Sequence, residues 1–193
     1  NDYAEMVAAP PQEITRGPAT LSAPARVEAG SAVTARWTGP ANEGDFISFA
    51  SPDQAGGQYE SYDWAKPGSN SVLLVAPGTP GEYELRYVLY TDREIMTRRQ
   101  IMVTAAEAIL SAPARVEAGA AITVEWTGPA NRGDFISLAR PDQTGGRYET
   151  YDWAKPGGAP VTLTSPEEPG TYELRYILYS DRMIVARIPI VVE

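Results

Sequence analysis

The sequence contains a direct repeat in which whole segments recur 89 residues further along, so that LSAPARVEAG begins at Leu21 and again at Leu110. The other repeated segments keep this offset: WTGPAN from Trp37 and Trp126, YDWAKPG from Tyr62 and Tyr151, and YELRY from Tyr83 and Tyr172. About two thirds of the aligned positions are identical, and the alignment needs no gap. Solenoid repeats have periods of roughly 20–50 residues. A unit of this length is therefore a whole small domain that has been duplicated.

The repeat divides the chain into four parts. We expect an N-terminal arm or linker over residues 1–20, a first domain over 21–105, a short joint over 106–109 and a second domain over 110–193. The arm contains three prolines and little periodicity. It is either a linker or an extended arm that pairs with a sheet edge. A joint this short limits the relative motion of the two domains.

Each repeat alternates short segments of strand composition with turns rich in glycine and proline. No sustained helical period occurs in either repeat. The strands expected in the first repeat are Leu21–Val27, Ser31–Trp37, Asp45–Ala50, Tyr59–Ala65, Ser71–Ala76, Tyr83–Tyr90 and Glu94–Thr104. Seven strands in roughly 85 residues predict an all-β protein with two tandem immunoglobulin-like antiparallel β-sandwiches and an N-terminal extended arm.

Four residues support this fold. Tyr83 follows a Pro-Gly turn at the start of the sixth expected strand, where a tyrosine corner lies in such sandwiches. Leu85 and Ala35 stand where antibody domains carry their disulfide, so we expect an apolar contact there. Trp37 alternates with Ala35 along its strand and is expected in the core.

The repeated motifs resemble a known family. The pattern WTGP-x-N-x-GDFI, then Y-x-x-Y, then PG-x-YELRY is similar to the immunoglobulin-like repeats appended to the C-terminal side of bacterial von Willebrand A-domain proteins. The resemblance covers nearly all of residues 21–193. It implies an extracytoplasmic, non-catalytic interaction or spacer module in a bacterium. Since this chain carries no von Willebrand A domain, no metal-dependent adhesion site is carried over.

The chain has no histidine and no cysteine. A Ser-His-Asp triad, a thiol nucleophile, a His or thiolate zinc site and a disulfide therefore cannot be built. Glycosidase chemistry needs two carboxyl groups roughly 5–9 Å apart in a cleft, which a small sandwich does not offer. Asp45 opens a strand outside any calcium-binding run of acidic residues, so it is expected to bond nearby backbone amides. We expect no enzyme activity, no catalytic residue, no metal and no cofactor.

Charge and hydropathy restrict the partners. With 25 acidic and 16 basic residues the formal net charge is −9, and no basic face suits a nucleic acid. No run of about 18 apolar residues could cross a bilayer. The chain begins with Asn1, so either a leader was removed or the sequence is a fragment. We expect no nucleic-acid partner, no membrane insertion and an extracytoplasmic location (periplasmic, cell-surface or secreted).

The motif YDWAKPG supplies the candidate binding residues. With the period of a strand, one face carries Tyr62, Trp64 and Lys66, and in the second repeat Tyr151, Trp153 and Lys155. An exposed Tyr-Trp pair can stack on a sugar ring or a partner's side chain, while the lysine contacts a carboxylate. In the alternative interpretation the tryptophan belongs to the core.

Two further observations bear on partners. Val88 shares an outward sheet face with Glu84 and Arg86, which predicts either a protein contact or a solvated face of Glu–Arg pairs. The loops of the two repeats differ by substitutions that add positive charge to the second, so an anionic ligand should prefer it: Glu43/Arg132, Ser51/Arg140 and Gln58/Arg147.

These observations predict a non-enzymatic extracytoplasmic tandem module for adhesion, protein–protein interaction or assembly, with strand pairing of the N-terminal arm as one mechanism. The expected partner is another protein or a second copy of the chain. Two alternatives stay open, namely a carbohydrate-binding module that uses the Tyr/Trp platforms and a passive rigid spacer.

Overall fold

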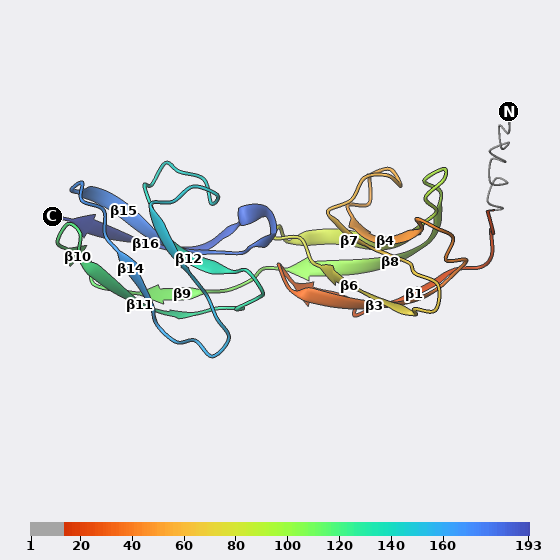
Figure 1. Ribbon diagram of the computed structural model, residues 1–193, viewed down its shortest axis with the longest axis horizontal. Coiled ribbons are helices and arrows are strands. Elements are labelled where there is room, and N and C mark those ends of the chain that lie inside the picture. Colours follow the sequence, from red (N-terminus) through yellow and green to blue (C-terminus); the bar gives the residue numbers. More distant parts are fainter. Residues whose placement is uncertain (1–13) are drawn as a thin grey trace, which may run out of the picture.

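The computed structural model describes residues 14–193. Two β-sandwiches lie end to end, the first built from strands of the first repeat and the second from strands of the second repeat (Figure 1). The expected all-β class with tandem immunoglobulin-like sandwiches is confirmed. Most of the expected N-terminal arm lies outside the described residues.

The first sandwich pairs a three-stranded sheet, in the order β1-β3-β6, with a five-stranded sheet, in the order β2-β8-β7-β4-β5. Its strands are β1 (Thr20–Ser22), β2 (Arg26–Glu28), β3 (Ala32–Thr38), β4 (Phe46–Ala50), β5 (Ser61–Trp64), β6 (Ser71–Val75), β7 (Gly81–Val88) and β8 (Ile95–Thr104).

The second sandwich repeats this arrangement, with sheet orders β14-β11-β9 and β10-β16-β15-β12-β13. Its strands are β9 (Ile109–Ser111), β10 (Arg115–Val116), β11 (Ala121–Thr127), β12 (Phe135–Ala139), β13 (Thr150–Trp153), β14 (Val161–Thr164), β15 (Gly170–Ile177) and β16 (Ile184–Val192). A 3-10 turn, η1 (Ser180–Arg182), joins β15 to β16.

The expected first strand, Leu21–Val27, is two strands that belong to different sheets. β1 pairs antiparallel with β3, whereas β2 pairs parallel with β8. Pro24 lies between them, and a proline has no N–H to donate to a ladder. The chain leaves one sheet there and joins the other, so each repeat has eight strands and the expected seven was wrong.

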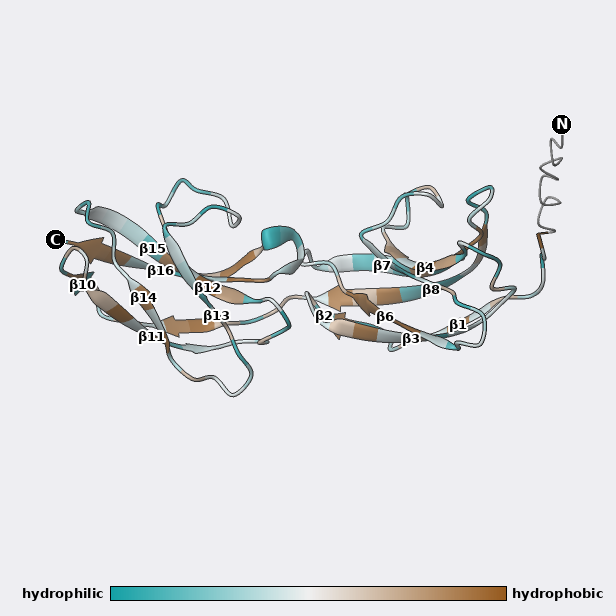
Figure 2. Ribbon diagram, in the orientation of Figure 1, coloured by the Kyte–Doolittle hydropathy of each residue, from teal (hydrophilic) through white to brown (hydrophobic). Residues whose placement is uncertain are grey.

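The core lies between the two sheets of each sandwich. Alternate residues of β3 are buried, among them Ala35 and Trp37, and Leu85 of β7 is buried as well. The hydroxyl of Tyr83 donates to the carbonyl oxygen of Thr79 at 3.0 Å, which confirms the tyrosine corner. Figure 2 shows hydrophobic residues recurring along the strands, while the loops are mostly hydrophilic.

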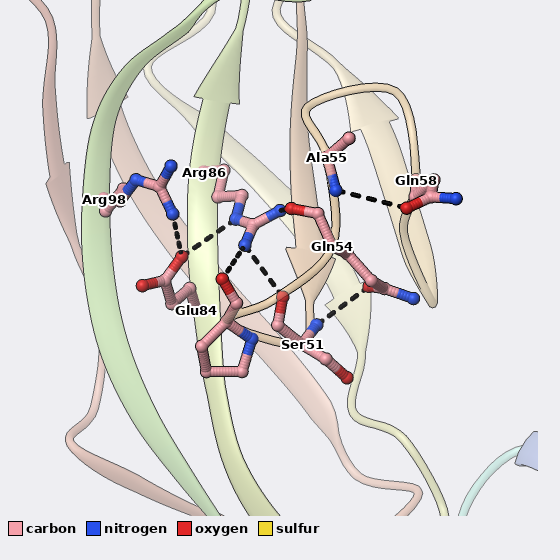
Figure 3. A network of polar contacts seen from close by, with 8 residues as sticks. Ser51, Gln54, Ala55, Gln58, Glu84, Arg86 and Arg98 are labelled. Carbon is pink, nitrogen blue, oxygen red and sulfur yellow. Dashed lines mark hydrogen bonds and ion pairs between the residues drawn. The ribbon is translucent and has the colours of Figure 1, made fainter.

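Part of the outer face of the five-stranded sheet is covered, because the loop over residues 51–60 folds across Arg86. Arg86 is completely buried, and its Nε donates to Glu84 at 2.9 Å (Figure 3). Its terminal nitrogens donate to three carbonyl oxygens of the loop at 2.7–3.1 Å, those of Ser51, Pro52 and Gln54. Val88 is buried beside it. The Glu–Arg pairs expected on this face are present, but Glu84, Arg86 and Val88 are buried, so these three residues form neither an open protein contact nor a solvated surface.

Polar contacts join the two sandwiches directly. The carboxylate of Asp181 in η1 accepts a hydrogen bond from the backbone N–H of Gly78 at 2.8 Å. The hydroxyl of Ser180 donates to the carbonyl oxygen of Ala76 at 3.2 Å. In the first repeat the equivalent residue, Asp92, instead forms an ion pair with Arg16. The turn before the last strand thus has a different partner in each repeat. In the second repeat it contacts the first sandwich, and in the first repeat it contacts Arg16 of the arm.

Candidate interaction surface

Three exposed aromatic side chains lie at the edge of the five-stranded sheet in the first repeat. Tyr62 and Trp64 project from β5, the last strand in the sheet order, and are 41% and 40% exposed. Tyr59, in the loop before β5, is exposed to a similar degree. We call Tyr59, Tyr62 and Trp64 the aromatic strip of the first repeat.

The strand register explains how the strip is held. Trp64 pairs with Phe46 and Tyr62 with Ser48, so both rings lie on the same face of the sheet as the buried ring of Phe46. The centroid of Phe46 is 5.7 Å from Tyr59, 5.8 Å from Tyr62 and 6.4 Å from Trp64, each in an edge-to-face arrangement. Such contacts add to the burial free energy of the rings. The exposed strip therefore stands on a buried aromatic support.

The second repeat builds the same strip from Tyr148, Tyr151 and Trp153 on Phe135. Tyr151 and Trp153 are 40% and 43% exposed. Their centroids lie 5.3 Å apart with planes at 87°, as against 5.1 Å and 84° in the first repeat. The expected common face of tyrosine and tryptophan is present in both repeats. The alternative that these tryptophans belong to the core is wrong, because β5 and β13 are edge strands.

The two lysines of the motif, Lys66 and Lys155, are exposed as the strip is. In the first repeat a shallow hollow of about 300 Å³ is lined by Trp64 and Lys66 on one side and by Glu43 and Gly44 on the other. The structure thus places tryptophan and lysine side by side, next to the loop before β4. Whether these residues bind a partner stays a prediction.

Sequence reasoning missed three residues that form or contact the aromatic strip in each repeat. Phe46 and Tyr59 were assigned to strands and Arg93 to the turn before the last strand, all without a role in binding. The guanidinium of Arg93 lies over the ring of Phe46 at 5.6 Å and over that of Tyr90 at 4.5 Å. Phe135, Tyr148 and Arg182 repeat this arrangement. Strand alternation was a usable signal, since it places Phe46 on the opposite face from the core residue Ile47.

The loop that carries Tyr59 is fixed at both ends. The buried guanidinium of Arg86 holds its first half through carbonyl oxygens. Its second half lies so close to the β7–β8 turn that a Cβ added at Gly56 would come within 2.0 Å of the carbonyl oxygen of Arg93. Only glycine allows this approach. Arg86 and Gly56 are thus positioning residues for the strip, although neither belongs to it.

Asp45 behaves as expected for a residue that organises a loop. Its carboxylate accepts hydrogen bonds from the backbone N–H of Asn42 at 3.0 Å and of Tyr90 at 3.1 Å. The hydroxyl of Tyr87 donates to it at 3.0 Å. In the second repeat, burial raises the pKa of the equivalent Asp134. Over residues 14–193 no group of three or more acidic side chains is placed to hold a metal ion.

The three charge substitutions between the repeats do not have equal effects. Arg140 donates to Glu168 at 2.7 Å and lies 3.7 Å from Glu149, so its charge is neutralised locally. Arg132 and Arg147 are exposed, and within the described part of the chain neither forms an ion pair. Two of the three expected positive charges therefore face solvent beside the second strip.

Within residues 14–193, no helix is long and apolar enough to cross a bilayer.

Comparison with known proteins finds no matching family model and no matching curated protein. Among solved structures, the chain is similar to the Escherichia coli adhesin FdeC, with 17% identity, a TM-score of 0.34, 93% of this chain covered and 66% of that one. It is also similar to the Yersinia pseudotuberculosis adhesin InvE, with 15% identity, a TM-score of 0.33, and 91% and 58% covered.

A third similar structure is the D0–D1 domain of intimin, with 11% identity, a TM-score of 0.29, and 89% of this chain and 96% of that one covered. The chain spans less than two thirds of the length of the FdeC and InvE structures. At these identities and TM-scores no function is carried over from any of the three. The association with von Willebrand A-domain proteins stays an expectation from the motifs.

Proposed function

We propose that this protein is a non-enzymatic, extracytoplasmic module for adhesion and protein–protein interaction, and that each repeat offers its aromatic strip to a partner. The observation that carries the proposal is the exposure of three packed rings in each repeat. Tyrosine and tryptophan are enriched at the energetic centres of protein interfaces. Rings already held by a buried phenylalanine lose little side-chain freedom on binding. The extracytoplasmic location rests on the resemblance of the motifs.

The second candidate function is carbohydrate binding, which the exposure of Trp64 and Trp153 favours. The geometry within each strip favours a protein. Tyr62 and Trp64 stand at 84° to each other, so they present no common flat surface to a sugar ring. A partner side chain can instead enter the angle between two such rings. Since β5 and β13 end their sheets, the partner can approach from the side as well as from above.

The test is a peptide selection run in parallel with a glycan array, both on the full chain. The double variant Trp64→Ala/Trp153→Ala is the comparison, and Tyr90→Ala/Tyr179→Ala is the matched control because these rings are also exposed. We expect selected peptides to lose at least tenfold in affinity with the tryptophan variant and little with the control. Glycan binding lost with the same variant would establish the carbohydrate function. If neither the peptide selection nor the glycan array shows binding that depends on the strip, the passive rigid spacer is the remaining interpretation.

Assembly through the N-terminal arm is a separate part of the proposal. Residues 1–13 lie outside the described residues, whereas Arg16 is tied to Asp92 and Glu94 and Thr20 begins β1. A truncation that removes only residues 1–13 therefore keeps every strand described for the first sandwich. We expect the full chain to form a defined oligomer by light scattering and the truncated chain to be smaller. Equal masses over a concentration series would exclude assembly through the arm.

A further inference from the structure

We propose that the aromatic strip of the second repeat binds an acidic protein segment, and that the strip of the first repeat does not share this preference. The inference rests on the proposed function, in which the strips bind proteins, and it adds the chemistry of the partner. It follows from the charges that surround two otherwise matching sets of rings.

Three positions flank each strip. In the first repeat they hold Glu43, Gln58 and Lys66, whose formal charges sum to zero. In the second repeat the same positions hold Arg132, Arg147 and Lys155, whose charges sum to plus three. The rings and their buried support are the same in both repeats, so charge is the property that distinguishes the two surfaces.

Two of the three positions line a hollow beside the tryptophan, and the third is next to the first tyrosine of the strip in the sequence. In the first repeat Glu43 and Lys66 line the same hollow as Trp64. The second repeat keeps the strand register, with Phe135 paired to Trp153 as Phe46 is to Trp64. Position 147 directly precedes Tyr148 in the chain. The positive charges therefore stand at both ends of the second strip.

These charges are available to a partner. Among residues 14–193, no carboxylate lies within ion-pair distance of Arg132, Arg147 or Lys155. All three side chains are exposed. The chain as a whole has a net charge of −9, so an uncompensated basic surface stands out against an acidic molecule. Arginine pairs in a two-pronged way with carboxylates.

The complementary partner is a segment in which acidic and apolar side chains alternate. Its carboxylates would meet the arginines and the lysine at the ends of the strip, and its apolar side chains would pack between the rings. Exposed ion pairs each contribute a few-fold in affinity. We therefore expect the second strip to bind such a segment about tenfold more tightly than the first.

The experiment titrates the full chain with the peptide (Glu-Leu)6 and follows the indole N–H signals of the four tryptophans by NMR. The buried Trp37 and Trp126 serve as internal references. The neutral peptide (Gln-Leu)6 is the control for apolar contact. We expect Trp153 to shift at about tenfold lower peptide concentration than Trp64, and the difference to shrink as salt is raised to about 0.5 M.

Exchanging residues between the repeats supplies matched variants. Arg132→Glu/Arg147→Gln gives the second strip the surroundings of the first, and Glu43→Arg/Gln58→Arg does the reverse. All four residues are exposed loop residues, and circular dichroism checks the fold of each variant. The first exchange should abolish the preference of Trp153, and the second should transfer it to Trp64.

The outcomes separate this inference from the proposed function. Equal shifts at Trp64 and Trp153, or a preference that survives Arg132→Glu/Arg147→Gln, overturn the acidic partner. The proposed function still stands in that case if the peptide selection yields strip-dependent peptides of no particular charge. If the indole signals of Trp64 and Trp153 do not shift and the peptide selection also fails, both the acidic partner and the proposed function are overturned. A shift of Trp153 with polygalacturonate but not with the peptide identifies an acidic polysaccharide and overturns the protein segment.

Discussion

At the scale of single residues, the stability of each sandwich depends on a buried arginine. Arg86 has no exposed surface, and its guanidinium binds Glu84 and the loop that covers the sheet (Figure 3). A charge inside a protein is tolerated only when its donors are satisfied. Arg175 repeats these contacts in the second sandwich. In each sandwich the loop is thus held on the sheet by hydrogen bonds from a buried guanidinium rather than by packing of apolar side chains.

Replacing Arg86 should therefore destabilise the first sandwich strongly. The change Arg86→Met leaves the loop carbonyl oxygens without their donor and removes one of the two arginines that donate to Glu84. We therefore expect the free energy of unfolding, measured in urea, to fall by about 3–5 kcal/mol. Arg98→Met is the control, because Arg98 pairs with the same Glu84 from an exposed position and should cost less than about 1 kcal/mol. Similar small losses for both variants would contradict the structural role of Arg86.

Two buried tyrosines should make the protein sensitive to alkali. Burial raises the pKa of Tyr87 and Tyr176 above the ordinary value of about 10. The folded state therefore holds these protons more tightly than the unfolded state does. Their contribution to stability is complete below about pH 10 and is lost as the pH rises further, by up to about 1.4 kcal/mol per pH unit for each.

The test compares the chain with the double variant Tyr87→Phe/Tyr176→Phe in urea between pH 8 and 11. The variant lacks both phenols, so its free energy of unfolding should fall less steeply above pH 10. It should already be less stable at pH 8, because each hydroxyl bonds a backbone N–H and an aspartate. Parallel curves above pH 10 would show that these phenols do not produce the alkaline loss.

At the scale of elements, the split between β1 and β2 leaves part of β8 without a hydrogen-bonded strand on the side away from β7. β2 pairs with β8 only at residues 102–104. The N–H of Met102 donates to Ala25 and so points away from β7. Strand alternation means that the N–H of Gln100 also points away from β7, toward an open edge, whereas that of Arg99 points to β7. The second repeat has Pro189 at the position of Gln100, which suits an edge.

This geometry predicts opposite effects for prolines at adjacent positions. Gln100→Pro removes an N–H that makes no ladder bond and should cost less than about 1 kcal/mol of unfolding free energy. Arg99→Pro removes a bond between β7 and β8 and should cost about 3 kcal/mol or more. Urea unfolding of the two variants measures the difference. A loss for Gln100→Pro as large as for Arg99→Pro would refute the assigned edge.

At the scale of the whole molecule, the two sandwiches touch through the tip of the second and the base of the first (Figure 1). Asp181 adopts a positive φ of 56°, which places its carboxylate against the N–H of Gly78. Apolar groups join these hydrogen bonds, because a Cβ built at Gly30 would lie 3.3 Å from the side chain of Leu178 and one at Gly78 would lie 3.2 Å from that of Met183. Contacts between domains of one chain usually permit relative motion unless they are large and hydrophobic. We infer that the hydrogen bonds from Gly78 to Asp181 and from Ser180 to Ala76 hold the sandwiches at a preferred angle that the short joint alone would not impose.

Removing the carboxylate should loosen the joint without unfolding either sandwich. Asp181→Gly keeps the positive φ accessible and deletes the acceptor. We expect the rotational correlation times of the two sandwiches, measured by NMR relaxation, to diverge while the unfolding midpoint changes little. Asp92→Gly, at the equivalent position of the first repeat, is the control and should leave the relative motion unchanged. Identical relaxation for both variants would show that the joint alone sets the angle.

Much of this architecture could be predicted from local patterns. The period of the repeat, the alternation along β3 and the Pro-Gly turn before Tyr83 each have a local cause in backbone geometry. The same reasoning explains Asp45, whose bonding partners include Asn42, three residues away. It failed at Leu21–Val27, because a strand that changes sheets has the same alternation as one that does not.

The sequence by itself determined the fold class, the duplication and, through the lack of histidine and cysteine, which kinds of catalytic and metal site these 193 residues cannot form. Only the tertiary structure decided which side chains meet solvent. Alternation assigns Trp64 and Arg86 to the outer face of one sheet, yet it does not say what covers that face. A folded loop buries Arg86, and the position of β5 at the edge of its sheet exposes Trp64. Burial depends on neighbours distant in the sequence, and those neighbours are set by the packing of the whole chain.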